Sequence, residues 1–232
     1  PKIMKITNYI YLAAVALLFA SCEIDNYEEP ESFFTGNIVY NGEPIEVGAR
    51  EVRFQLFQPG FGALAPLDVH LDLDGSFSGR FFDGDYKLKF INGQGPFKAY
   101  EVNEQQGDTI FISLRGNTNL DIEVLPYYML RNETFNAGTA AVDASASYEQ
   151  IITGADARNI EFARLYLNDT EQVSNNGDYH MVWSDMTVGD GTLSGSTALP
   201  DGYSKPYVFA RIALKIAGVE DMLFSPVQKL DL

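Results

Sequence analysis

A short row of alternating polar side chains comes nearest, in residue type and spacing, to a metal or catalytic site. Asp68, His70, Asp72 and Asp74 occupy every second position. On a β-strand they would share one face, with neighbouring side chains about 6.5–7 Å apart. Only adjacent pairs could then share a divalent cation, and Asp72-x-Asp74-Gly75 lacks the further ligands of a complete calcium loop. We therefore expect a solvated polar face and no metal site.

No recognised catalytic motif occurs in the sequence. Serine-hydrolase, zinc-protease and glycine-rich phosphate-loop patterns are absent, and His70 and His180 are the only histidines that could act as a general base. Glycoside hydrolysis needs only two carboxylates, so a polysaccharide hydrolase stays open as an alternative. We expect no catalytic residues and no cofactor.

A better candidate for binding chemistry is a set of aromatic and arginine residues in the second half of the chain. Residues 160–168 and 206–216 each place apolar side chains on one strand face and leave the other face to larger groups. The residues on this second face are Phe162, Arg164, Tyr166, Tyr207, Phe209 and Arg211. If the two strands are neighbours in one sheet, the rows merge into an exposed platform that suits sugar stacking or a protein contact.

Two alternatives to this exposed platform remain open. The face could pack against the first half of the chain or against a loop, or the alternation could be inverted. Trp183, the single tryptophan, is a further candidate binding residue, and its alternative is a position in the core.

The elements that would position these residues are β-strands almost throughout. In the first half, polar and apolar residues alternate at 51–56, 67–74 and 86–90, between turn signals such as Asn41-Gly42. In the second half we expect strands at 139–150, 160–168, 179–186, 191–197, 206–216 and 221–228. Closely spaced strands are typical of β-sandwiches. No helical period extends over ten residues, so we expect almost no helix after Cys22.

A domain boundary is predicted near Pro126. Residues 119–125 read as the strand that closes the first unit, and proline cannot donate a hydrogen bond to a β-ladder, so it suits a junction. We therefore expect two all-β domains, at residues 33–125 and 126–232. The second has the length and the six or seven strands of an immunoglobulin-like or fibronectin-like sandwich.

The start of the chain predicts export and a lipid anchor. Two lysines precede an apolar run at residues 9–20, which is too short to span a bilayer. This pattern describes a secretory signal peptide at residues 1–21. Cys22, the only cysteine, resembles the lipidated residue of a bacterial lipobox, with Phe19 where leucine is usual. The acidic stretch at residues 22–32 is expected to be a tether.

The charge of the chain excludes several kinds of partner. Without the predicted signal peptide, 14 Lys and Arg stand against 32 Asp and Glu, a net charge of about −18. Nucleic acids and anionic lipid surfaces both attract basic patches, so neither is an expected ligand. The expected membrane contact is the lipid anchor itself.

Motifs in both halves resemble known families. Residues 73–77, with an Asp-Gly hairpin, and residues 82–88 resemble the prealbumin-like, carboxypeptidase-regulatory-like sandwich. Together with Asp25-Asn26-Tyr27 and residues 225–229, they make the whole chain similar to a Bacteroidetes lipoprotein family of unknown function. The resemblance implies an outer-membrane, surface-exposed protein beside glycan-uptake systems of the starch-utilisation type. It implies no catalytic residues.

These observations predict a lipid-anchored, non-catalytic accessory protein. Its expected partners are the membrane through the lipid anchor, a glycan, and an outer-membrane uptake complex. The alternative of a different class is a structural spacer or scaffold that presents another protein at the cell surface.

Overall fold

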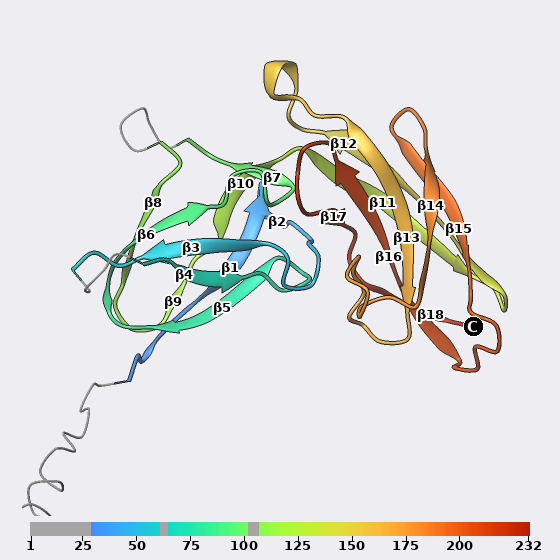
Figure 1. Ribbon diagram of the computed structural model, residues 1–232, viewed down its shortest axis with the longest axis horizontal. Coiled ribbons are helices and arrows are strands. Elements are labelled where there is room, and N and C mark those ends of the chain that lie inside the picture. Colours follow the sequence, from blue (N-terminus) through green and yellow to red (C-terminus); the bar gives the residue numbers. More distant parts are fainter. Residues whose placement is uncertain (1–28, 61–64, 102–106) are drawn as a thin grey trace, which may run out of the picture. The chain divides into compact units, whose positions relative to one another are not determined.

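The computed structural model describes residues 29–60, 65–101 and 107–232 (Figure 1). Glu31–Leu232 form one compact unit. In the described ranges the only helical element is the short turn η1 (Gly154–Asp156), so the all-β prediction is confirmed. None of the described segments is a helix long and apolar enough to cross a membrane. The predicted signal peptide and Cys22 lie outside the described residues.

The first sandwich is organised around strand β1. One sheet contains β1 (Ser32–Tyr40), β2 (Glu43–Pro44), β5 (Ser76–Phe81), β7 (Phe97–Ala99), β9 (Thr118–Asn119) and β10 (Ile122–Pro126). The other has the order β4 (Leu67–His70), β3 (Arg53–Phe57), β6 (Gly84–Phe90), β8 (Ile110–Leu114). Strand β1 pairs antiparallel with β2 and β5 and parallel with β9 and β10.

The core of the first sandwich is aromatic. Phe34, Phe54 and Phe77 are buried, and the Phe77 ring lies 4.9 Å from the Phe34 ring and 5.0 Å from the Phe54 ring, between centroids. Tyr86 is also buried, and its hydroxyl donates to the Phe82 carbonyl oxygen at 2.8 Å. Phe77 and Tyr86 thus both fill this core. The inward faces follow the period of two that the sequence showed.

Gly36 is the position where β1 tolerates no side chain, because a Cβ added there would lie 2.0 Å from the Leu120 carbonyl oxygen. Backbone cannot move aside as a flexible side chain can, so we expect Gly36→Ala to lower the free energy of unfolding by about 1–3 kcal/mol. Gly177→Ala is the matched control, since nothing lies within 4 Å of its added Cβ. Urea unfolding of both variants measures the difference, and equal stability of the two would contradict the packing described.

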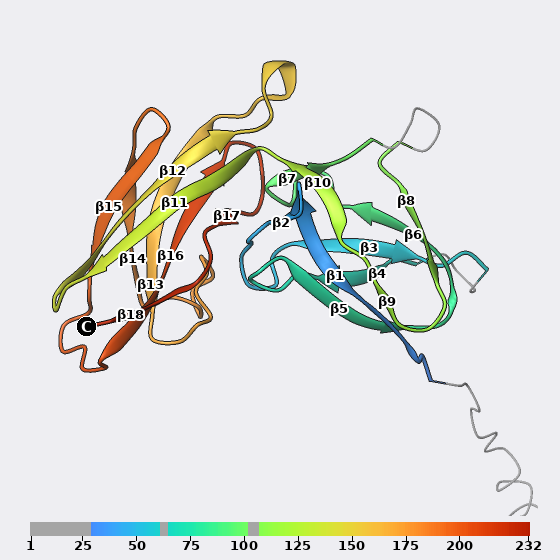
Figure 2. The same cartoon turned by 180° about the vertical axis from the view of Figure 1, so that it is seen from behind.

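The second sandwich has longer strands on average than the first. Its strands are β11 (Tyr128–Ala137), β12 (Ala141–Gln150), β13 (Ile160–Asn168), β14 (Val182–Val188), β15 (Thr192–Ala198), β16 (Tyr207–Ile216), β17 (Leu223–Phe224) and β18 (Gln228–Asp231). Strands β11 and β12 lie side by side, and β15 follows β12 (Figure 2). Strand β14 joins the strands around β13 to those around β15, because its first residues pair with β13 and its last two pair with β15.

Two differences from the predicted strands have local causes. Strand β11 is absent from the predicted set, because a register shift between Arg131 and Thr134, with Asn132 at φ 53°, breaks its alternation. The strand predicted at 221–228 is divided, because the buried Ser225 lies between β17 and β18. The Ser225 hydroxyl accepts the Ile212 N–H at 3.0 Å.

Candidate functional site

The predicted aromatic and arginine residues do lie on neighbouring strands of one sheet. Strands β13 and β16 pair antiparallel, with Tyr166 opposite Arg211. Strand β14 lies on the other side of β13 and places Trp183 opposite Tyr166. The alternation has the predicted sense, because the residues between these aromatic and arginine positions, such as Leu165 and Ile212, are fully buried.

The middle of this row is covered, so the prediction of one exposed platform is wrong. Tyr166 is 2% exposed and Arg211 is 0% exposed. Both faces of the sheet are packed, since Tyr166 belongs to a second apolar cluster on the outer face. The buried members of this cluster are Tyr166, Val173, Ala213, Met222 and Phe224. Neither Tyr166 nor Arg211 can therefore contact a ligand from solvent.

Arg211 instead connects the two sandwiches. Its Nη1 donates to the Val47 and Val173 carbonyl oxygens at 2.9 and 3.1 Å. Its Nη2 donates to Glu46 Oε2 and the Leu73 carbonyl oxygen, both at 3.1 Å, and its Nε donates to the Ser225 carbonyl oxygen at 2.7 Å. A guanidinium has five N–H donors, and each has a partner here.

Removal from water shifts the pKa values of both Arg211 and its partner Glu46. Burial lowers the pKa of Arg211 to about 10, against the opposing effect of Glu46, so the guanidinium is charged at neutral pH. Burial raises the pKa of Glu46 to about 7, although Arg211 acts in the other direction. A charge this deep is tolerated only when hydrogen bonds replace water. The network is therefore structural, and it fixes the segments that carry Val47 and Leu73.

One end of the predicted row remains exposed as a stack of three side chains. The Arg164 guanidinium lies 4.2 Å from the Phe162 ring centroid and 3.9 Å from the Trp183 ring centroid. Arg164 Nε also donates to Asp185 Oδ1 at 2.8 Å. Trp183 is 42% exposed, so it does not fill the core. We call Phe162, Arg164 and Trp183 the aromatic stack.

The other end of the row carries Tyr207 and Phe209, whose rings meet edge to face at 5.7 Å. Lys229 Nζ lies 4.5 Å from the Tyr207 ring centroid. Both aromatic residues are partly exposed, and Phe209 and Lys229 line a cleft. The predicted platform is thus divided into two separate exposed parts by the buried middle of the row.

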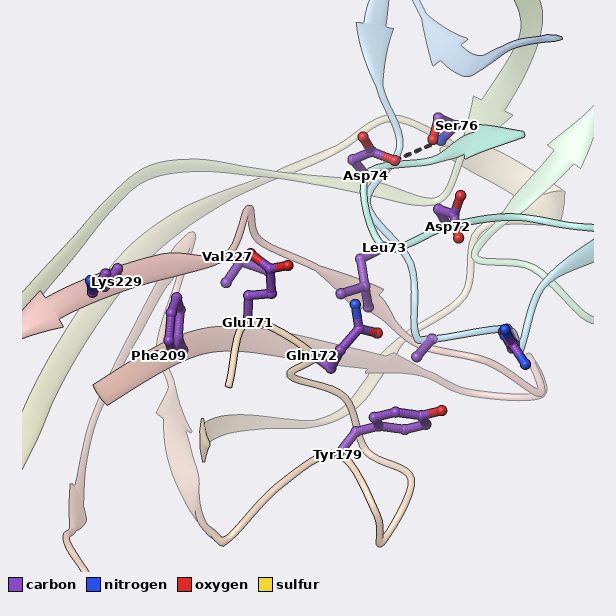
Figure 3. Close-up of a pocket in the computed structure, with 12 residues that line it drawn as sticks. Asp72, Leu73, Asp74, Ser76, Glu171, Gln172, Tyr179, Phe209, Val227 and Lys229 are labelled. Carbon is purple, nitrogen blue, oxygen red and sulfur yellow. Dashed lines mark hydrogen bonds between the residues drawn. The ribbon is translucent and has the colours of Figure 1, made fainter. Parts of the chain in front are cut away.

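The cleft that includes Phe209 has a volume of about 700 Å³ (Figure 3). Its lining residues are Ala49, Arg50, Asp72, Leu73, Asp74, Ser76, Glu171, Gln172, Tyr179, Phe209, Val227 and Lys229. Figure 3 shows Asp72 and Asp74 on one side of the cleft and Gln172 and Tyr179 on the other. The first group comes from the first sandwich and the second from the loop between β13 and β14.

The cleft combines aromatic surface with many hydrogen-bonding groups. Asp72, Asp74 and Glu171 supply acceptors, and Asp74 Oδ1 is held in place by the Ser76 N–H at 3.0 Å. Tyr179 and Phe209 supply apolar faces. Sugars present hydroxyl groups at their edges and C–H groups on their faces, so this composition fits a carbohydrate.

The walls of the cleft are tied together below its surface. The Leu73 carbonyl oxygen is one of the acceptors of Arg211, and the Ala49 N–H donates to Ser174 Oγ at 3.1 Å. Val47, two residues before Ala49, donates its N–H to the Leu73 carbonyl oxygen as well. Binding in a preformed cleft avoids the entropic cost of ordering its walls.

The two halves of the chain match the two domain models of one family. Residues 32–125 match the "Protein of unknown function (DUF3823) N-terminal domain", and residues 128–229 match the "Domain of unknown function (DUF3823_C)". The chain belongs to the DUF3823 family. The predicted resemblance to a Bacteroidetes family of unknown function is therefore confirmed. Comparison with curated proteins gives no match.

Solved structures share the fold of this DUF3823 chain. A DUF3823 protein from Parabacteroides merdae is 28% identical, with a TM-score of 0.74, over 88% of this chain and 100% of that one. One from Bacteroides ovatus is 27% identical, with a TM-score of 0.74, over 87% and 100%. A candidate carbohydrate-binding protein from Bacteroides uniformis is 16% identical, with a TM-score of 0.69, over 88% and 100%.

Sequence reasoning misses most of the cleft in this DUF3823 chain. The strand predicted at 179–186 begins with Tyr179, but β14 begins only at Val182 and Tyr179 belongs to the preceding loop. Glu171, Gln172 and Arg50 lie in irregular segments that show no period. The polar composition of the loop is visible in the sequence, but nothing there indicates which residues it would face.

The alternating row of Asp68, His70, Asp72 and Asp74 continues beyond its strand. Strand β4 ends at His70, and Asp72 and Asp74 lie in the following turn, where the Asp72 N–H donates to the Ser76 carbonyl oxygen at 2.8 Å. Within the described ranges, no group of three or more His, Cys, Asp or Glu side chains could hold a metal ion. Asp72 and Asp74 line the cleft instead.

Proposed function

We propose that this protein is a lipid-anchored, non-catalytic accessory protein that binds glycan beside a cell-surface uptake complex. The observation that carries the proposal is the cleft of about 700 Å³, which brings Tyr179 and Phe209 together with three carboxylates and an amide. Ligand sites of this size bind small molecules through apolar surface and a few placed polar groups. A Bacteroides uniformis protein of the same fold is described as a candidate carbohydrate-binding protein, which agrees with this choice of ligand.

The proposal of binding without turnover rests on the sequence, and the structure shows how the two histidines are held. His70 Nδ1 contacts the Arg50 carbonyl oxygen at 3.0 Å, and His180 Nδ1 contacts the Ser174 and Asn176 carbonyl oxygens at 3.0 Å. Each ring therefore has one nitrogen committed to the backbone. The sequence offers no recognised nucleophile motif to accompany them.

The proposed location rests on the sequence. An apolar run followed by Cys22 supports lipidation, and acyl chains supply about 0.8 kcal/mol per buried CH₂, enough for several chains to anchor the protein. The acidic chain would be repelled by anionic lipid headgroups, so the anchor provides the attachment. We propose an outer-membrane, surface-exposed position next to a glycan-uptake complex.

A second function, presentation or bracing of a partner protein, is favoured by the aromatic stack. Tryptophan and arginine are among the residues that most often dominate protein interfaces, and Trp183 is exposed beside Arg164. Cross-linking in the native membrane with Trp183→Ala and the unaltered chain distinguishes this function. If Trp183→Ala loses a cross-linked partner but still binds glycan, the result favours the scaffold function.

We expect Tyr179→Ala and Phe209→Ala each to weaken glycan binding about tenfold, because each removes one apolar face of the cleft. The measurement is calorimetric titration of neutral polysaccharides into the chain that starts after Cys22. Phe111→Ala is the matched control, since Phe111 is 60% exposed and does not line the cleft. Equal affinities in all three variants would exclude the cleft as the glycan site.

A further inference from the structure

A second hollow continues the cleft along the first sandwich. It has a volume of about 390 Å³ and is lined by Arg50, Asp68, Val69, His70, Asp72, Ser78, Gly79 and Phe81. Arg50 and Asp72 also line the cleft of about 700 Å³. Because the two hollows share these lining residues, they adjoin at Arg50 and Asp72, and we treat them together as one groove.

We propose that this groove binds a linear, uncharged oligosaccharide across at least two subsites, an inference that rests on the proposed glycan-binding function. The first subsite is the aromatic cleft with Tyr179 and Phe209, and the second is the hollow beside His70. A ligand confined to the cleft would gain nothing from the second subsite. Affinity should therefore depend on chain length.

The polar row of the sequence forms one wall of the groove. Asp68, His70, Asp72 and Asp74 are all exposed, while Val69 between them is buried. Asp74 lines the cleft, Asp68 and His70 line the hollow, and Asp72 lines both. Strand β4 and the turn that follows it thus give the groove a row of polar groups along which a linear polymer can lie.

The hydrogen-bonding character of this wall favours hydroxyl donors. His70 Nδ1 lies 3.0 Å from the Arg50 carbonyl oxygen, which can only accept, so a neutral ring keeps its proton on Nδ1. Its Nε2 is then an acceptor. Asp72 and Asp74 are acceptors as well, and sugar hydroxyls can donate to all three. Uronate or sulfate groups would meet like charge along the same wall.

Arg50 holds an unusual backbone conformation at the join. Its φ is 58°, in the left-handed region where glycine is relaxed and a bulky residue is strained. Its side chain is exposed and lines both hollows. Strained backbone conformations cluster at binding and active sites, where the surrounding structure holds them in place. Arg50 would supply a donor to the ring and hydroxyl oxygens of the chain passing over it.

The test is calorimetric titration of neutral gluco-, xylo- and manno-oligosaccharides of increasing length into the chain that starts after Cys22. We expect at least about a tenfold rise in affinity from the disaccharide to longer members of the series that binds. His70→Ala should remove this rise and leave disaccharide binding unchanged, because His70 lines only the second subsite.

Arg50→Gly should weaken binding of the longer members more than binding of the disaccharide, because Arg50 lies at the join. Its melting temperature should be equal to that of the unaltered chain or higher, since glycine relaxes the backbone. Lys87→Ala is the control for lost surface charge, because Lys87 is exposed and lines neither hollow.

Three results would overturn parts of this account separately. Affinity independent of length, with His70→Ala unchanged and Tyr179→Ala weakened, would overturn the second subsite and leave the proposed function standing. Tighter binding of oligogalacturonate than of any neutral chain would overturn the charge preference. No binding at any length would overturn the proposed function itself.

Discussion

We expect Arg211→Ala to lower the free energy of unfolding by about 3–5 kcal/mol, the cost of breaking a buried ion pair. The substitution leaves Glu46 without its partner and removes the donors to the Val47, Leu73, Val173 and Ser225 carbonyl oxygens. Buried acceptors without partners lose their hydration and gain nothing in return. Urea unfolding followed by tryptophan fluorescence measures this loss.

Arg164→Ala is the matched control for the Arg211 prediction. Arg164 also stacks on aromatic rings and pairs with a carboxylate, but its side chain is 26% exposed. A pair at the surface contributes about 1 kcal/mol or less. If Arg164→Ala were as destabilising as Arg211→Ala, the assignment of Arg211 as the connection between the sandwiches would be wrong. Arg211→Lys should not rescue stability, because an ammonium cannot reach five divergent acceptors.

We expect stability to fall as pH rises from about 4 to about 7. Burial, together with the nearby Glu51, raises the pKa of Asp221 to about 7. Burial likewise raises the pKa of Glu51. Glu51 Oε2 and Asp221 Oδ2 have no hydrogen-bond partner among the described residues. Two such carboxyls are stable when protonated and repel each other when both ionise.

The sign of this pH effect follows from proton linkage. The folded chain keeps protons that the unfolded chain releases near pH 4, so the stabilisation is complete below that pH and is lost through about pH 7. We expect a loss of about 2–4 kcal/mol over this range. Exposed Asp83, Asp85 and Asp156 have pKa values lowered by hydrogen bonds, so they act only at lower pH.

Asp221→Asn tests the pH prediction by removing one of the two buried charges. The variant should show a flatter profile of unfolding free energy against pH and should be more stable than the unaltered chain at about pH 8. Asp143→Asn, at an exposed position on β12, is the matched control and should leave the profile unchanged. A profile that rises toward pH 8 in the unaltered chain would contradict the burial of this pair.

Strands and their faces could be predicted from the sequence where side chains alternate. Leu165 and Ile212 point inward as expected, and β13 and β16 are neighbours. What covers the opposite face could not be predicted. Arg164 and Arg211 sit in the same kind of pattern, yet one is partly exposed and the other fully buried. The difference comes from segments distant in sequence, such as those of Val47 and Phe224.

The cleft could not be predicted from the sequence for a related reason. Its residues come mainly from turns and loops, whose conformations are set by hydrogen bonds rather than by a period. The Tyr179 N–H donates to the Asn176 carbonyl oxygen within its loop, and Ser174 Oγ accepts the Ala49 N–H from the first sandwich. Of the cleft residues, only Phe209, on a regular strand, is among the binding residues that the sequence predicts.

The most direct test of the glycan-binding account is a glycan-array screen of the chain that starts after Cys22, with the Tyr179→Ala, Phe209→Ala double variant beside it. We predict a defined set of neutral glycans bound by the unaltered chain and lost in the double variant, with both proteins equally folded by circular dichroism. A blank array for the folded, unaltered chain would contradict the account and would favour the scaffold function at the aromatic stack.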